Sequence, residues 1–143
     1  MAENYFKKAI LYAPSDIEYQ NNLGVVLVVQ PLKKSEAKEV FNKVLKQNSK
    51  DLTALSYLAN MAFENADYQE AKEKIQAYID INNQDAGAIT LLGAIYYKSG
   101  NKEGAKEQWQ KALQVNPEFE AAKNNLIILE QESQLPQDKE GQP

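Results

Sequence analysis

The segment GAKEQWQKALQVN at residues 104–116 decides the fold, because two earlier segments repeat its pattern. EAKEKIQAYIDIN occupies residues 70–82 and EAKEVFNKVLKQN occupies residues 36–48, so each copy starts 34 residues after the one before it. In the first copy the apolar residues Ala37, Val40, Phe41, Val44 and Leu45 recur at helical spacing. This spacing predicts a helix that buries one face.

A second set of related segments precedes the first at a similar period. These are TLLGAIY at residues 90–96, SYLANMA at 56–62 and NNLGVVL at 21–27, with offsets of 34 and 35 residues. The extra residue falls near Gln30–Lys34, where it predicts a longer turn. A fixed period of this length is the signature of a repeat protein, in which each unit stacks on its neighbours.

Residues that begin or end helices lie at the expected junctions between the segments. Asp16, Asp51 and Asp85 are placed to cap the first helix of each unit. Asn116 followed by Pro117 predicts a cap with proline in the first turn of a last helix. No stretch alternates apolar and polar residues as a strand does. The sequence therefore predicts an all-α chain built of helical hairpins.

Composition excludes several classes of function. The chain of 143 residues contains no His, no Cys and no Arg, and its net charge is −4. Catalytic triads, thiolate or imidazole metal sites and arginine clamps for phosphate are therefore not available. We expect no enzyme activity, no cofactor, no metal and no nucleic-acid partner, since the last would need a basic face. The longest apolar run, Leu23–Val29, is too short to insert into a membrane.

The repeat resembles the tetratricopeptide repeat (TPR) family. In the third unit the pattern reads Leu92-Gly93, Tyr96, Ala105, Trp109, Ala112 and Pro117, and the other two units match it less completely. The resemblance implies a right-handed superhelix of antiparallel helical hairpins, with about eight helices in all. It also implies a non-enzymatic scaffold that binds another protein, because family members hold partner segments in a concave groove lined by first helices.

The resemblance also predicts how the TPR domain of residues 2–133 is divided. We expect a half repeat at 2–14, full repeats at 16–49, 51–83 and 85–116, a capping helix at 117–133 and a disordered tail at 134–143. A half repeat at the start indicates either a fragment of a longer repeat protein, which could carry a separate effector domain, or a helix that pairs with another chain. The compartment stays open: cytoplasmic by default, periplasmic if a signal or anchor precedes this chain.

Residues carried over to the groove form the predicted peptide-binding site. Its asparagines could bind a peptide backbone and its apolar residues could hold side chains. The alternative is that the amides cap turns or face water while the apolar residues form the hairpin core. The predicted groove residues are Asn21, Asn22, Val25, Val28, Tyr57, Asn60, Phe63, Leu91, Ala94, Tyr97 and Asn125. Since Lys98 is the one cation among the groove positions, we do not expect the groove to hold an acidic tail.

The second hypothesis for function is self-association. The half repeat carries Tyr5, Phe6 and Ile10 with no first helix before them, so these residues predict a face through which the chain forms a homo-oligomer. A structural or assembly module of this kind resembles, loosely, the short bacterial TPR proteins that assist envelope or pilus assembly.

Overall fold

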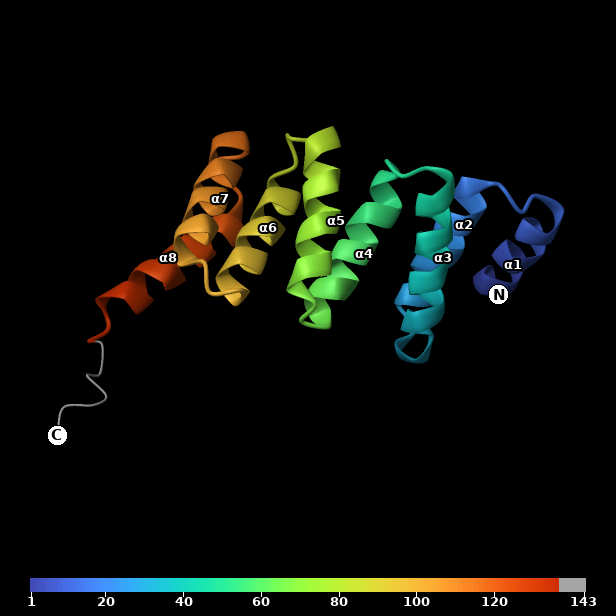
Figure 1. The fold of residues 1–143 in the computed structure, drawn as a ribbon, viewed down its shortest axis with the longest axis horizontal. Coiled ribbons are helices and arrows are strands. Elements are labelled where there is room, and N and C mark those ends of the chain that lie inside the picture. The colour runs from blue at the N-terminus through green and yellow to red at the C-terminus, as the bar shows by residue number, and fades with distance from the viewer. Residues whose placement is uncertain (137–143) are drawn as a thin grey trace. The chain divides into compact units, whose positions relative to one another are not determined.

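A computed structural model of the chain describes residues 1–136 (Figure 1). Within these residues the chain forms eight α-helices, one short 3-10 helix and no strand, which confirms the predicted all-α class. Most of the tail expected at 134–143 lies outside the described residues. The helices fall into two compact units, Met1–Asn83 and Gln84–Pro143, and each unit is described by itself.

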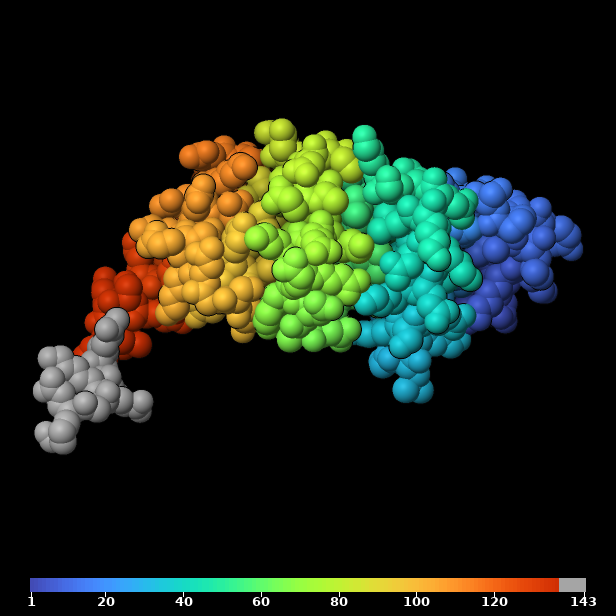
Figure 2. All heavy atoms as spheres, viewed as in Figure 1, coloured from blue at the N-terminus to red at the C-terminus, as the bar shows by residue number. Residues whose placement is uncertain are grey.

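Unit 1 consists of a leading helix and two helical hairpins. Its helices are α1 (Ala2–Tyr12), α2 (Ile17–Val28), α3 (Lys34–Gln47), α4 (Leu52–Glu64) and α5 (Tyr68–Ile81), with the 3-10 helix η1 (Pro31–Lys33) between α2 and α3. We call α2 and α4 first helices, and α1, α3 and α5 second helices. Figure 2 shows α3 and α5 on the face turned toward the viewer, where Lys38 on α3 binds Glu70 on α5 at 2.9 Å.

The hairpin of α2 and α3 is held together by a ring packed on a glycine. Phe41 on α3 is fully buried, and a Cβ on Gly24 of α2 would lie 2.6 Å from its ring. Such a distance leaves no room for a side chain, so glycine lets the two helices cross closely. Leu27 and Leu58 complete the buried core beside this contact.

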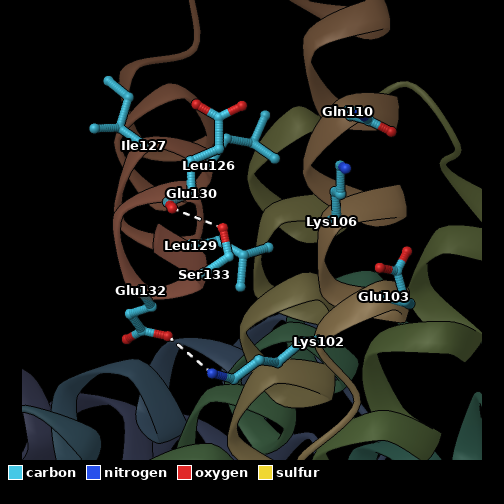
Figure 3. Close-up of a pocket in the computed structure, with 10 residues that line it drawn as sticks. All are labelled: Lys102, Glu103, Lys106, Gln110, Leu126, Ile127, Leu129, Glu130, Glu132 and Ser133. Carbon is cyan, nitrogen blue, oxygen red and sulfur yellow. Dashed lines mark hydrogen bonds and ion pairs between the residues drawn. The ribbon is translucent and has the colours of Figure 1, made fainter. Parts of the chain in front are cut away.

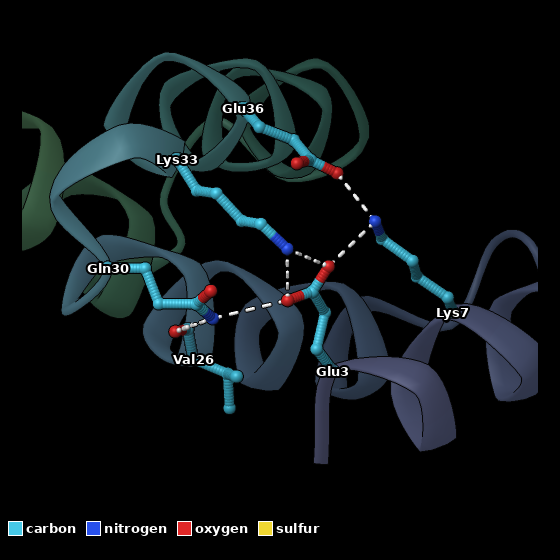
Figure 4. Close-up of polar contacts among 6 residues, drawn as sticks. All are labelled: Glu3, Lys7, Val26, Gln30, Lys33 and Glu36. Carbon is cyan, nitrogen blue, oxygen red and sulfur yellow. Dashed lines mark hydrogen bonds and ion pairs between the residues drawn. The ribbon is translucent and has the colours of Figure 1, made fainter. Parts of the chain in front are cut away.

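Helix α1 is fastened to unit 1 by a cluster of polar contacts around Glu3 (Figure 4). Its carboxylate accepts bonds from Nζ of Lys33 at 2.6 Å and from Nε2 of Gln30 at 3.2 Å, and it pairs with Lys7 at 2.8 Å. The bonds from Lys33, and then those from Lys7 and Gln30, lower the pKa of Glu3 to about 2. Since Gln30 and Lys33 belong to the turn that carries the extra residue, this longer turn supplies the donors that hold α1.

Unit 2 contains the first helix α6 (Ala86–Lys98), the second helix α7 (Lys102–Val115) and the first helix α8 (Glu120–Gln134). The hairpin of α6 and α7 repeats the contact of unit 1, since a Cβ on Gly93 would lie 2.4 Å from Nε1 of Trp109. That nitrogen donates to the backbone oxygen of Thr90 at 3.1 Å, which fixes the indole ring. The bulky residue and the small residue predicted from the repeat therefore meet.

The predicted caps hold for the first helices of the hairpins but not for α8. The side chains of Asp16, Asp51 and Asp85 each accept a bond from a backbone N–H in the first turn. Asn116 instead ends α7, and its side chain accepts from the backbone N–H of Glu118 at 3.1 Å. The chain turns through Pro117, so α8 begins at Glu120 rather than at 117.

Among the helices of residues 1–136, none is both long enough and apolar enough to cross a membrane. The exact limits of the repeats stay a prediction, although every expected helix has a counterpart in the described part of the chain.

Candidate functional site

A small hollow in unit 2 brings together side chains from three helices. Ala94, Tyr97 and Lys98 come from α6, Trp109 from α7, and Asn125 and Ile128 from α8. Its volume is about 190 Å³, on the scale of one large amino-acid side chain. Three of the predicted groove residues, Ala94, Tyr97 and Asn125, therefore line one cavity. The fourth in this unit, Leu91, is half-buried on α6 and is not among the lining residues.

The aromatic wall of the hollow is rigid. The Trp109 side chain is 3% exposed and its ring centre lies 6.0 Å from that of Tyr97, with the planes tilted by 40°. Since the indole nitrogen is already bonded to Thr90, Trp109 offers the hollow an apolar surface. A ligand group here would meet a fixed surface.

Tyr97 connects the hollow to the last turn of α8. Its hydroxyl donates to the carboxylate of Glu132, and this bond raises the pKa of Tyr97. Nζ of Lys102 binds the same carboxylate at 3.1 Å and lies 5.9 Å from the centre of the Tyr97 ring. The bond from Tyr97, followed by the one from Lys102, lowers the pKa of Glu132. The position of the tyrosine ring is thus set from α6, α7 and α8 at once.

Polar groups on the rim of the hollow are free to bind. Asn125 is half-buried and its side chain has no hydrogen-bond partner among the described residues. An amide in this position offers both a donor and an acceptor, which suits the backbone of a peptide. Lys98 is exposed at the end of α6 and forms no ion pair with another residue in the range 1–136.

The predicted residues of unit 1 are divided between core and surface. Val25, Val28 and Tyr57 are partly buried against the core cluster, and the Tyr57 ring stacks on Phe41 with ring centres 5.1 Å apart. Phe63 is half-buried and packs on Tyr68 at 5.9 Å. The packing of these side chains supports the hairpin core and leaves only part of each surface for a ligand.

The three asparagines predicted in unit 1 differ in what they bind. The amide of Asn21 donates to both carboxylate oxygens of Asp51 at 3.1 Å, so it supports the cap of α4. The amide of Asn60 donates to the backbone oxygen of Ser56 at 2.8 Å, within its own helix. Asn22 is half-buried and has no partner in the described part of the chain. Asn22 is therefore the asparagine of this unit whose whole amide is available.

The predicted self-association face on α1 is mostly turned inward. Phe6 and Ile10 are partly buried against the core of unit 1, whereas Tyr5 is 61% exposed. The more exposed apolar residues of this helix are Leu11 and Tyr12, at 81% and 92%. Sequence reasoning did not single out these two residues.

Trp109 and Glu132 also belong to the site, although they were not predicted as groove residues. A signal for Glu132 exists in the sequence: Lys102 and Glu132 are 30 residues apart, and Lys34 and Glu64 form the equivalent ion pair one double repeat earlier, at 2.7 Å. Within residues 1–136, no group of acidic residues is arranged to hold a metal ion.

Comparisons with known proteins agree with the repeat. Two family models described as tetratricopeptide repeat match the sequence, one over residues 32–86 and the other over residues 86–119. The chain belongs to the tetratricopeptide repeat family. Proteins of this family are generally interaction modules without enzyme activity, and they bind protein or peptide partners.

Solved structures show the same fold. A crystal structure of MamA covers 92% of this chain and 76% of its own, with a TM-score of 0.84 and 23% identity. MamA from Desulfovibrio magneticus RS-1 covers 92% and 73%, with a TM-score of 0.84 and 24% identity. YrrB, described as a TPR protein with an unusual peptide-binding site, covers 87% and 64%, with a TM-score of 0.76 and 21% identity. No curated protein matches this chain.

Proposed function

We propose that this chain is a non-enzymatic scaffold that binds a segment of a partner protein along the first helices. The observation that carries the proposal is the hollow between α6, α7 and α8, which is lined by Ala94, Tyr97 and Asn125 at predicted groove positions. An apolar side chain of the partner fills the hollow against Trp109 while the free amide of Asn125 binds the partner's backbone. The peptide-binding site described for YrrB supports the same class of ligand.

The chemistry of the site favours binding over catalysis. The titratable side chains at the hollow are Tyr97 and Lys98, and the pKa of Tyr97 is raised, which makes the tyrosine a poorer base near neutral pH. With neither His nor Cys in the sequence, no other nucleophile or base is at hand. The neutral, amide-bearing rim suits an uncharged peptide segment.

A library of displayed peptides tests the proposal for a partner of any sequence. Selection against the whole chain should enrich peptides with a recurring apolar residue, and these peptides should change the fluorescence of Trp109, the only tryptophan. In the variant Ala94→Leu, the added side chain fills the hollow, so we expect the selected peptides to bind at least tenfold more weakly.

The matched control for this experiment is Gln110→Leu, which makes a similar apolar change at an exposed position of α7 outside the hollow. The control should bind the peptides as the unchanged chain does. Equal binding by Ala94→Leu and by the unchanged chain would remove the hollow from the proposal.

Self-association is a second proposed function, and one observation on α1 favours it. Tyr5, Leu11 and Tyr12 are exposed apolar side chains on a second helix that no first helix of its own repeat covers. A homo-oligomer formed through α1 would bury them. Sedimentation of Tyr12→Glu beside the unchanged chain tests this: a sedimentation coefficient that does not change argues against α1 as the contact.

A further inference from the structure

The side of α8 opposite the buried Ala122 exposes a continuous uncharged surface. Ile127 is 52% exposed, Ile128 is 51% exposed, and Leu135 just after the helix is 66% exposed. We name this surface the outer stripe of α8. Its residues are Ala121, Asn124, Ile127, Ile128, Gln131, Gln134 and Leu135. The exposed side of α7, by contrast, is rich in charge, with Lys102, Glu103, Lys106, Glu107 and Lys111.

The spacing within the outer stripe is that of a helix that pairs with another helix. Ala121, Ile128 and Leu135 follow one another at intervals of seven residues, with Asn124 and Gln131 between them. Apolar residues at such heptad positions form the seam of paired helices, and an amide at a seam position fixes register and orientation. A helix that faces only water does not need a seam of this kind.

A further hairpin of the same type does not fit on this surface. Ile127 follows Gly93 by one repeat of 34 residues, and it therefore occupies the position at which Gly93 receives Trp109. Because even a Cβ at Gly93 would lie 2.4 Å from the indole, an isoleucine at the equivalent position keeps a second helix from approaching as closely. The same argument applies to α1 of another copy, whose Phe6 holds the ring position of a second helix.

We propose that two copies of this chain associate through the outer stripes of α8, as an antiparallel pair centred near Ile127. Two isoleucine-bearing helices pack at ordinary interhelical distance, so the bulk of Ile127 fits this contact. Asn124 lies opposite the partner's Gln131, and the partner's Asn124 lies opposite Gln131. Both amide pairs are then satisfied, because each amide contains a donor and an acceptor.

Charge selects the antiparallel orientation. Lys123 and Glu130 lie on the same flank of α8, seven residues apart. In an antiparallel pair Lys123 faces the partner's Glu130 on that flank, and the two-fold symmetry forms this ion pair twice. In a parallel pair Glu130 would instead face the flank with the partner's Glu132, and like charges would repel.

The surface beside the stripe enlarges the contact. Figure 3 shows Leu126, Ile127 and Leu129 on α8 across a second hollow from Lys106 and Gln110 on α7. This second hollow measures about 440 Å³ and opens next to Ile127. Because one helix contributes most of each side, the interface is small, and we expect a weak dimer with a Kd on the order of 10–100 µM.

Sedimentation velocity over a concentration series tests the proposal on the whole chain. We expect a monomer–dimer equilibrium in which Ile127→Glu weakens association at least tenfold. The matched control is Tyr12→Glu, which places the same charge at an exposed apolar position of α1 and should leave the equilibrium unchanged. A chain that stays monomeric at millimolar concentration overturns the proposal, as does loss of the dimer in Tyr12→Glu alone.

The orientation is tested by introducing single cysteines, since the sequence contains none. Ile127→Cys lies near the two-fold axis and should form a disulfide-linked dimer under mild oxidation, which requires Cα atoms within about 7 Å. Ala121→Cys would lie roughly 20 Å from its copy in an antiparallel pair and should stay monomeric. Efficient cross-linking of both variants would indicate a parallel pair and contradict the proposed orientation.

Charge reversal gives a third readout that does not depend on the isoleucines. Lys123→Glu and Glu130→Lys should each weaken the dimer, and the double variant should restore it because both ion pairs reform with exchanged signs. Helical circular dichroism of each variant establishes that the chain is folded. A double variant that is weaker than either single variant contradicts the predicted facing of the two residues.

Discussion

The hydroxyl of Tyr97 donates a hydrogen bond to the carboxylate of Glu132, which joins a residue of the candidate site to the last turn of α8. Lys102 binds the same carboxylate from α7. The three residues hold the wall of the hollow in place without occupying its interior. The candidate site is therefore shaped before any ligand arrives, which reduces the entropy lost on binding.

Removing this hydroxyl should loosen the hollow without unfolding unit 2. In Tyr97→Phe the ring still packs near Trp109, but Glu132 keeps only Lys102 as a partner. We expect the melting temperature to fall slightly and the fluorescence of Trp109 to become easier to quench. Acrylamide quenching measures the second effect, and the exposed Tyr12→Phe is the control. Quenching equal to that of the unchanged chain would contradict a positioning role for the hydroxyl.

The contacts of Glu3 predict how stability depends on pH. Its pKa is about 2 in the folded chain, below the ordinary value of 4.5, because Lys33, Lys7 and Gln30 bind the charged form. A lowered pKa stabilises the folded state above pH 4.5, and this stabilisation is lost as the pH falls toward 2. The difference in unfolding midpoint between the unchanged chain and Glu3→Gln should therefore be present at about pH 6 and vanish near pH 2. A difference that stays constant with pH would contradict the assignment.

Close packing at Gly93 predicts a large effect of a small substitution. Gly93→Ala adds a methyl group that would lie 2.4 Å from Nε1 of Trp109, so the indole must move and its bond to Thr90 must weaken. We expect a loss of about 1–3 kcal/mol in the free energy of unfolding. Urea denaturation followed by Trp109 fluorescence measures it. Gly87→Ala on the same helix is the control, where the nearest atom is 3.2 Å away, and equal losses in both variants would rule out the indole as the cause.

The neighbouring residues Asn21 and Asn22 should separate stability from binding. Asn21→Ala removes the hydrogen bonds to Asp51 and should cost about 1 kcal/mol of stability. Asn22→Ala removes an amide without a partner in the described residues and should leave stability unchanged. Thermal unfolding distinguishes the two variants. If the groove of the first helices binds a peptide, Asn22→Ala is the variant that weakens the binding of the selected peptides.

The sequence alone was sufficient to predict the local structure. The 34-residue period, the apolar spacing and the capping residues predicted the helices and the pairing of Gly93 with Trp109, because these depend on contacts between neighbours in the chain. The start of α8 was predicted too early, since the Asn116 side chain can cap a turn as readily as a helix. Proline in the next position is compatible with both.

What tertiary structure decided is which groove residues are free. From sequence, Asn21 and Asn22 are equivalent amides, yet one is bonded to Asp51 and the other has no partner in the described chain. Likewise Tyr57 packs on Phe41, whereas Tyr97 lines a cavity. Periodicity determines the face of a helix on which a side chain lies, because that depends on the backbone repeat alone. Whether the side chain is engaged depends on residues far along the chain, such as Asp51 for Asn21, and only their distances in the folded chain reveal it.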